Sequence, residues 1–329
     1  MKIRILFFVL IGFLFASCAT SVSPIPTQIP ISTSSVTQTP TLVLTPTPPV
    51  ADTLTPAFTP KAVPTLPEED ARKRMLDLLA NNGGCQLPCL WGIMPGKSTS
   101  QEAQVIWSPL SSIQSIYDIK PSFGPKGGYI SPDFVEGDLI LHTEVSYLSD
   151  NQIVSQIAFQ AKEIKKFTIS NSADGILDIF DSTAFGNRIK YYSIQNVLSE
   201  LGIPSSVMIV THRVPVPKGG DGGFDILLLY PDQGILVNYT MQGYLVGSNM
   251  RGCPTNAHVE MELYPPGNAD SFFALLEKTD WAVKKNWYKP LEDVTSMSVD
   301  EFYQTFRQLT NKCIDTSIKL WPTPQPGGE

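Results

Sequence analysis

The sequence contains little histidine and no excess of positive charge. Its 329 residues include 3 histidines, 24 lysines and arginines, and 31 aspartates and glutamates. Nucleic acid demands clustered positive charge, so this composition argues against a nucleic-acid partner. No histidine stands at metal-ligand spacing from another, and each falls in an expected strand. We therefore expect no metal centre and interpret His142, His212 and His258 as exposed strand residues.

Sequence motifs of common enzyme classes are also missing. There is no Gly-x-Ser-x-Gly nucleophile elbow. The residues Gly96-Lys97-Ser98 could end a phosphate-binding loop, but the first glycine of that loop would fall at Trp91. We therefore exclude a nucleotide site and expect no cofactor. Two groups of aspartates could bind calcium, but neither has the EF-hand pattern and we expect both to be solvated: Asp174, Asp178 and Asp181, and Asp221, Asp225 and Asp232.

The N-terminal apolar run is too short to cross a bilayer. Residues 5–15 are apolar apart from Gly12, whereas a membrane-spanning helix needs about 20 such residues. Two basic residues precede the run and two small residues follow it. This order is typical of a secretory signal, so we predict a cleaved signal peptide at residues 1–17.

The four residues Phe15-Ala16-Ser17-Cys18 resemble the lipobox of bacterial lipoproteins. Phenylalanine stands where that motif usually has leucine, followed by two small residues and the cysteine. The resemblance implies that Cys18 is the acylated, palmitate-bearing first residue of the mature chain. Membrane lipid would then anchor the protein on the extracytoplasmic side of the bacterial envelope. The alternative is an ordinary signal peptide with an incidental cysteine.

Acylation of Cys18 would leave an even number of the five cysteines. An even remainder in an exported chain indicates disulfide bonds. We expect a local bond between Cys85 and Cys89 and a long-range bond between Cys253 and Cys313, and the two other pairings stay open. A redox or metal role for the first pair is the lesser alternative, because its spacing is not Cys-x-x-Cys and no histidine lies near it in sequence.

Residues 18–67 form a segment of low charge, rich in threonine and proline, in which only Asp52 and Lys61 are charged. Such a composition buries too little apolar surface to offset the entropy of ordering the chain. We predict a disordered tether here and a disordered tail at residues 322–329. Repeated Thr-Pro favours extended polyproline II, which would hold the folded part away from the membrane.

Residues 68–321 carry the periodicities of packed helices and strands. Thr99 with Glu102 and Ser298 with Glu301 form two capping boxes, each of which predicts the start of a helix. Residues 121–137 are rich in proline and glycine and predict a loop. Helices are expected at residues 68–80, 99–110, 194–201, 269–278 and 298–309, and strands at residues 113–119, 139–147, 153–159, 206–212, 224–230, 235–239 and 258–264.

The order helix, strand, loop and hairpin occurs twice along the chain. It predicts an α+β fold of two tandem helix-plus-antiparallel-sheet units, residues 68–170 and 171–321, the second with a C-terminal helical extension. Gly96-Lys97-Ser98 with Glu102 and Ala103, and residues 193–204, resemble the units of SmpA/OmlA-type lipoproteins and β-lactamase-inhibitor-like proteins. The first copy lacks the closing Leu-Gly-x-Pro and the second lacks the opening glycine. The resemblance implies a fold and no activity.

Residues 85–96 also resemble the start of uncharacterised bacterial surface lipoproteins. These features together predict a membrane-anchored binding module for a protein, glycan or other envelope component. The alternative is an extracellular hydrolase whose site has no recognisable motif. Six aromatic residues could form the binding surface, or could instead pack beneath a helix: Tyr191, Tyr192, Phe224, Tyr230, Tyr239 and Tyr244.

Overall fold

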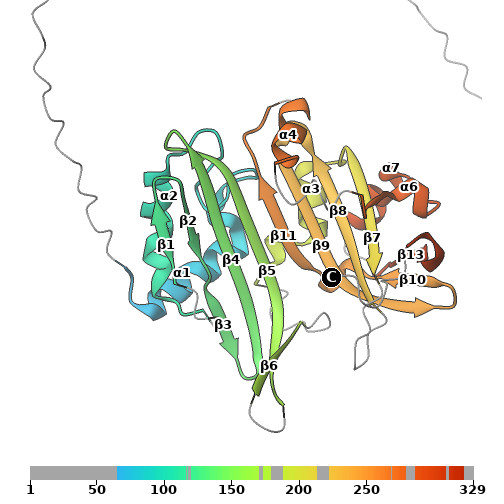
Figure 1. The fold of residues 1–329 in the computed structure, drawn as a ribbon, viewed down its shortest axis with the longest axis horizontal. Helices are drawn as coiled ribbons and strands as arrows, with labels where there is room; N and C mark the ends of the chain where they lie inside the picture. The colour runs from blue at the N-terminus through green and yellow to red at the C-terminus, as the bar shows by residue number, and fades with distance from the viewer. Residues whose placement is uncertain are drawn as a thin grey trace, which may run out of the picture. The chain divides into compact units, whose positions relative to one another are not determined.

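The chain divides into two units, Met1–Thr59 and Pro60–Glu329, and every residue described below belongs to the second. The computed structural model describes residues 65–115, 117, 120–169, 173–178, 188–212, 222–267, 269–278, 286–308 and 311–321 (Figure 1). The signal segment, Cys18, almost all of the tether, and the tail lie outside the described residues, as do Asp181, Asp221 and Leu309. The side chains of Asp174 and Asp178 are likewise outside the described part.

The described part is a mixed α/β structure built on a large antiparallel sheet. Its strands run in the order β1-β2-β4-β5-β11-β9-β8-β7-β12, while β3 pairs with β4, β6 with β5, and β10 with both β9 and β13. The strand bounds are Ser122–Gly124 (β1), Gly127–Ile130 (β2), Asp133–Glu136 (β3), Leu139–Asp150 (β4), Ile153–Ile169 (β5), Ala173–Asp178 (β6), Ser206–His212 (β7), Gly222–Tyr230 (β8), Ile235–Val246 (β9), Asn249–Gly252 (β10), His258–Leu263 (β11), Lys289–Pro290 (β12) and Ile314–Ser317 (β13).

Both predicted capping boxes are confirmed. The backbone N–H of Glu102 donates to Thr99 Oγ1 at 3.1 Å, and the Thr99 N–H donates back to the Glu102 carboxylate at 2.7 Å. Ser298 and Glu301 repeat this exchange at 3.2 and 2.9 Å. The helix bounds are Glu68–Asn81 (α1), Ser100–Trp107 (α2), Ile194–Leu201 (α3), Ala269–Leu276 (α4), Leu291–Val294 (α6) and Val299–Phe306 (α7).

The two predicted hairpins are confirmed as β4–β5 and β8–β9. Between β4 and β5 the chain reverses through Asn151 and Gln152, whose φ angles of 49° and 68° are both positive. Two such residues are what a type I′ turn requires, and this turn matches the right-handed twist of the strands. The local turn sets the pairing of Asp150 with Ile153 and of Ser149 with Val154, and a register shift between Ser149 and Leu148 sets the pairing of the remaining residues.

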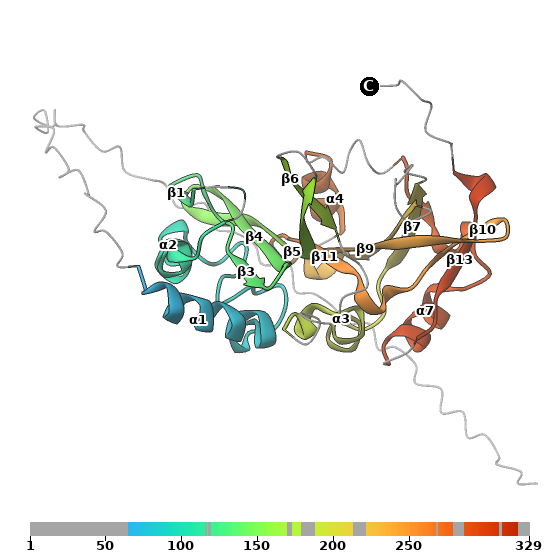
Figure 2. The same cartoon turned by 90° about the horizontal axis from the view of Figure 1, so that it is seen from below.

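One face of the sheet carries the main core. A row of fully paired neighbours crosses five strands, and all its members are buried: Val145, Phe159, Met261, Val237 and Leu228. Side chains of α1, α2, α3 and α7 belong to the same cluster, so these helices cover this face. Figure 2 shows α1, α3 and α7 on this side and α4 on the other, where Phe272 and Leu276 pack on a smaller cluster with Leu229 and Leu236.

Two expectations for residues 113–137 are wrong. The described residues of the 113–119 segment form no strand, because the chain leaves a short 3₁₀ helix, Ser108–Ser112, and buries Ile113 in the core. The expected loop at 121–137 instead contains β1, β2 and β3. Glycine in β2 reflects close packing rather than a loop, since a Cβ on Gly128 would lie 2.5 Å from the Tyr147 ring.

The two expected sheets are joined into one by β11. This strand pairs with β5 on one side and with β9 on the other, antiparallel to both. Two three-stranded meanders therefore flank β11, β2-β4-β5 on one side and β7-β8-β9 on the other, each with its last strand next to β11 (Figure 1). Because β5 and β9 are both antiparallel to β11, they run in the same direction, so the two meanders are mirror images. Helices α1 to α3 cover one face of the sheet, and a rotation that keeps them on that face does not superpose the two meanders. The order of elements that recurs along the chain is therefore not repeated by rotation in space.

Candidate functional site

One buried polar group that the sequence did not predict is His142, in the first half of β4. In the antiparallel registers it lies opposite Asp133 of β3 and opposite Lys162 of β5. Side chains alternate along a strand, so His142 and Glu144 share the face of the sheet that points away from α1 to α3. Three strands thus bring ionisable groups together at one place.

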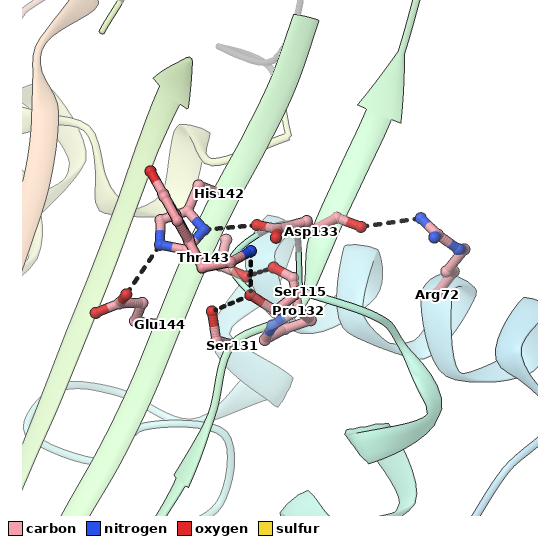
Figure 3. Close-up of polar contacts among 9 residues, drawn as sticks. Arg72, Ser115, Ser131, Pro132, Asp133, His142, Thr143 and Glu144 are labelled. Carbon is pink, nitrogen blue, oxygen red and sulfur yellow. Dashed lines mark hydrogen bonds and ion pairs between the residues drawn. The ribbon is translucent and has the colours of Figure 1, made fainter. Parts of the chain in front are cut away.

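Both ring nitrogens of His142 contact carboxylates (Figure 3). Nδ1 lies 2.6 Å from Asp133 Oδ1, and Nε2 lies 2.9 Å from Glu144 Oε1. His142 and Asp133 are each 1% exposed, whereas the Glu144 side chain is 34% exposed. An ionised carboxylate only accepts hydrogen bonds, so both nitrogens must donate. This geometry selects the positively charged imidazolium.

The electrostatics of the cluster agree with this protonation state. Burial opposes a charge on His142, but the hydrogen bonds with Asp133 and Glu144 outweigh burial and raise its pKa. The bond with His142 in turn lowers the pKa of Glu144. Burial raises the pKa of Tyr129 to about 12, and the neighbouring charge of Glu144 contributes to that increase.

Backbone and side-chain hydrogen bonds fix Asp133 in place. Arg72 of α1 donates to the Asp133 carbonyl at 3.0 Å, and the Asp133 N–H donates to Gln114 O at 3.3 Å. The Thr143 hydroxyl donates to Pro132 O at 2.6 Å (Figure 3). The ring of Tyr117 packs edge-on against His142, with centroids 4.8 Å apart. The cluster therefore joins β3 to β4, α1 and the chain before β1.

This arrangement is poorly suited to acid–base catalysis. A general base needs a free nitrogen within reach of a substrate proton, and both nitrogens of His142 are engaged and buried. The expectation of exposed histidines is correct for His212 and wrong for His142 and His258, which is 8% exposed. The His-x-Glu spacing was visible in the sequence, but the Asp133 partner depends on the β3–β4 register.

Four of the six aromatic residues considered for a binding surface are buried in the main core. Tyr192, Phe224, Tyr230 and Tyr239 are each at most 1% exposed, because they lie on the helix-covered side of the structure. This burial corrects the assignment of these four to a surface and agrees with the alternative that they pack beneath a helix. Half-buried Tyr191 donates to Glu200 at 2.8 Å, and half-buried Tyr244 donates to Gln242 at 3.2 Å.

The two expected disulfide bonds are confirmed. Cys85 pairs with Cys89, and Cys253 pairs with Cys313, with Cα atoms 5.8 and 4.2 Å apart. Asn82, fully buried at the end of α1, organises the first loop: its Nδ2 donates to the carbonyls of Cys85 and Cys89, both at 2.8 Å. The second bond ties the residue after β10 to the residue before β13, and these two strands also pair directly.

The second aspartate group is not uniformly solvated. Asp232 is exposed, but Asp225 is 8% exposed, a correction that follows from its place on β8 within the sheet. Among the described residues, no group of three or more histidine, cysteine or acidic side chains is arranged to hold a metal ion. In the same part of the chain, no helix has the length and apolarity to span a membrane.

On the side of the sheet opposite the main core, half-buried polar residues form a second row of paired neighbours. Glu144, Gln160, Glu260 and Asn238 follow one another across β4, β5, β11 and β9, and we refer to them as the polar row.

Comparison with known proteins finds no family whose model matches this chain and no curated protein that matches it. Its own residues therefore carry the functional argument.

Proposed function

We propose that this protein is a bacterial lipoprotein, attached through acylated Cys18 to the extracytoplasmic side of a membrane of the cell envelope. The cysteine pairing carries this proposal. Cys85, Cys89, Cys253 and Cys313 are all consumed in two disulfide bonds, which are typical of exported proteins. Cys18 is the remaining cysteine, and it stands at the end of a signal-like apolar segment.

In this proposal residues 1–17 are removed as a signal peptide and residues 18–67 act as the tether. The threonine- and proline-rich composition supports an extended tether. Residues 68–170 and 171–321 are proposed as two units of one folded module. They share with SmpA/OmlA-type and β-lactamase-inhibitor-like units the order of elements along the chain, but not a common arrangement in space. Each contributes a capped helix and a hairpin, α2 with β4–β5 and α3 with β8–β9, which supports this division.

We further propose that the folded part is a binding module and that the polar row is its contact surface. The equivalent row on the opposite side of the sheet is wholly apolar and buried, so the polar row is not required for the main core. The amide and carboxylate groups of Glu144, Gln160 and Glu260, on three adjacent strands, suit hydrogen bonding to a protein, glycan or other envelope component, whereas Asn238 Oδ1 is buried. Tyr129, half-buried beside Glu144, extends this surface onto β2.

Anchoring is tested by expressing the full chain in a bacterial host with a clickable fatty acid. The chain should take up the label and sediment with membranes, and Cys18→Ser should abolish both effects. Ser17→Ala is the matched control, because it keeps a small residue before the cysteine and should still be labelled. A labelled Cys18→Ser chain would contradict the lipid anchor.

Binding is tested by placing a photo-crosslinking residue at Gln160 or at Glu260 of the full chain in intact cells. Adducts should form at these positions and not at the exposed control position Glu69 of α1, on the helix-covered side. Equal crosslinking from Glu69 would remove the polar row as the contact surface. Hydrolysis of common substrates without any adduct would favour the hydrolase alternative.

A further inference from the structure

Strand β3 is attached to the rest of the sheet by few interactions. It has four residues and, among the described strands, pairs with β4 alone. Phe134 is buried, but Val135 is 53% exposed and Glu136 is exposed. So short a strand gains little from its backbone ladder. Within the described part of the chain, Asp133 forms a buried ion pair with His142, whereas the ion pair of Glu136 with Arg188 is exposed.

The charge balance at this link depends on one proton. Asp133 on β3 and Glu144 on β4 contact the two ring nitrogens of His142. Tyr129 on β2 interacts with Glu144, and Lys162 on β5 lies opposite His142. Tyr117 packs against the ring edge-on. A neutral imidazole keeps one N–H, so one of its nitrogens would meet a carboxylate with no proton between them. A buried carboxylate that loses its cationic partner is strongly destabilising.

We propose that Asp133, His142 and Glu144 form a pH-dependent latch, which holds the edge strand β3 on β4 while His142 is protonated and loosens β3 when that proton is lost. Opening of the latch would free the backbone groups of β4 from Leu139 to His142, which β3 now covers. An uncovered strand edge is a template for pairing with another strand. The latch therefore controls access to one edge of the sheet.

The direction of the effect follows from proton linkage. The latched state has the raised His142 pKa, and the loosened state exposes the ring to solvent and returns it towards about 6.5. The contribution of the His142 proton to latch closure is therefore complete below about pH 6.5 and weakens by up to about tenfold per pH unit until the raised pKa is passed. Above the raised pKa of His142, a further increase in pH removes no more latch stability through this residue.

Hydrogen–deuterium exchange of the full-length Cys18→Ser chain tests the latch, between about pH 6 and about pH 9.5, a range that spans the unperturbed His pKa of about 6.5. After correction for intrinsic exchange rates, amides of β3 and of β4 at Leu139–His142 should lose protection as the pH rises. Amides of the β8–β9 hairpin serve as the internal reference and should keep theirs. Equal losses in both regions would overturn the proposal, because they would indicate global destabilisation.

Two variants separate the latch from other titrations. Glu144→Gln removes a charge from a half-exposed side chain that tolerates replacement. It should reduce the pH-dependent loss of amide protection in β3 by about tenfold for each unit by which the His142 pKa falls. His212→Gln, at the exposed histidine of β7, should leave the profile unchanged. An unchanged profile in Glu144→Gln, or an altered one in His212→Gln, would contradict the proposal.

Discussion

Trp91 Nε1 donates a hydrogen bond of 2.8 Å to the hydroxyl of Tyr192, which itself donates to Asn82 Oδ1 at 3.1 Å. The Trp91 ring also packs edge-on against Trp107 and Phe159, with centroids 6.2 and 5.7 Å apart. The loop after α1 is thereby bonded to the segment before α3. The distinctive stretch around Cys85 and Trp91 thus has a structural role at the junction of the two halves of the chain.

Tyr192→Phe should destabilise the fold by about 1–3 kcal/mol, because it leaves the buried Trp91 N–H without an acceptor. Urea unfolding followed by tryptophan fluorescence gives the free energy of unfolding. Tyr244→Phe is the matched control, since this half-buried hydroxyl bonds to Gln242 near the surface and its loss should cost well under 1 kcal/mol. Equal losses in the two variants would show that the Trp91 bond has no special weight.

Asn82→Ala should cost at least about 3 kcal/mol, because two effects add. It removes the side-chain acceptor of the Trp91 backbone N–H and the side-chain donor to the carbonyls of Cys85 and Cys89. It also places alanine at a φ of 56°. Asn82→Gly keeps the left-handed backbone and should be less harmful by about 1 kcal/mol. The difference between the two variants, measured by urea unfolding, separates backbone strain from lost hydrogen bonds.

The exposed neighbour Asn81 provides a control for that pair. Its side chain accepts from the Gly83 N–H at 2.8 Å, so Asn81→Ala should cost only about 0.5–1 kcal/mol. A cost as large as that of Asn82→Ala would show that the loop tolerates neither change, and that the burial of Asn82 is not the cause.

Replacement of Cys253 and Cys313 together by serine should lower the free energy of unfolding by about 4 kcal/mol in the chain-entropy model, because the bond spans 60 residues. The same replacement of Cys85 and Cys89, which are four residues apart, should cost only about 2 kcal/mol. Guanidinium unfolding of both double variants gives the comparison. A larger loss from the local pair would mean that the Cys85–Cys89 bond acts by holding the Trp91 loop in the folded state.

Acid should weaken the fold through Glu144. Its pKa is lowered by the hydrogen bond with His142, so its contribution is present above its unfolded pKa of about 4.3 and is lost as the pH falls through the lower folded value. Glu144→Gln should therefore flatten the acid limb of a plot of unfolding free energy against pH. Glu69→Gln, at an exposed position of α1, should leave that limb unchanged. A steep limb in Glu144→Gln would assign acid sensitivity to other carboxyl groups.

Local signals in the sequence predicted local structure well. The capping boxes at Thr99 and Ser298 and the alternation of β4 and β5 depend on residues near one another in the chain, and all are confirmed. The position of β11 between β5 and β9 depends on strands far apart in sequence, so its alternation showed a strand without showing its partners.

The histidine cluster escaped prediction for the same reason. His142 lies on a strand that was identified correctly, but its partner Asp133 lies in a segment whose proline and glycine content indicates a loop. Only the β3–β4 register places the two side chains 2.6 Å apart. Burial of Tyr230 and Tyr239 was likewise undetermined, because alternation does not say which face of a sheet the helices will cover.

The place of β11 also determines when the sheet can be completed during synthesis. A chain grows from its N-terminus, yet the strand at the centre of this sheet is His258–Leu263. Until that segment arrives, β5 and β9 each have an unpaired edge facing the gap that β11 will fill. A chain synthesised only as far as residue 257 therefore contains two half-sheets, and without β11 no described strand joins β5 to β9.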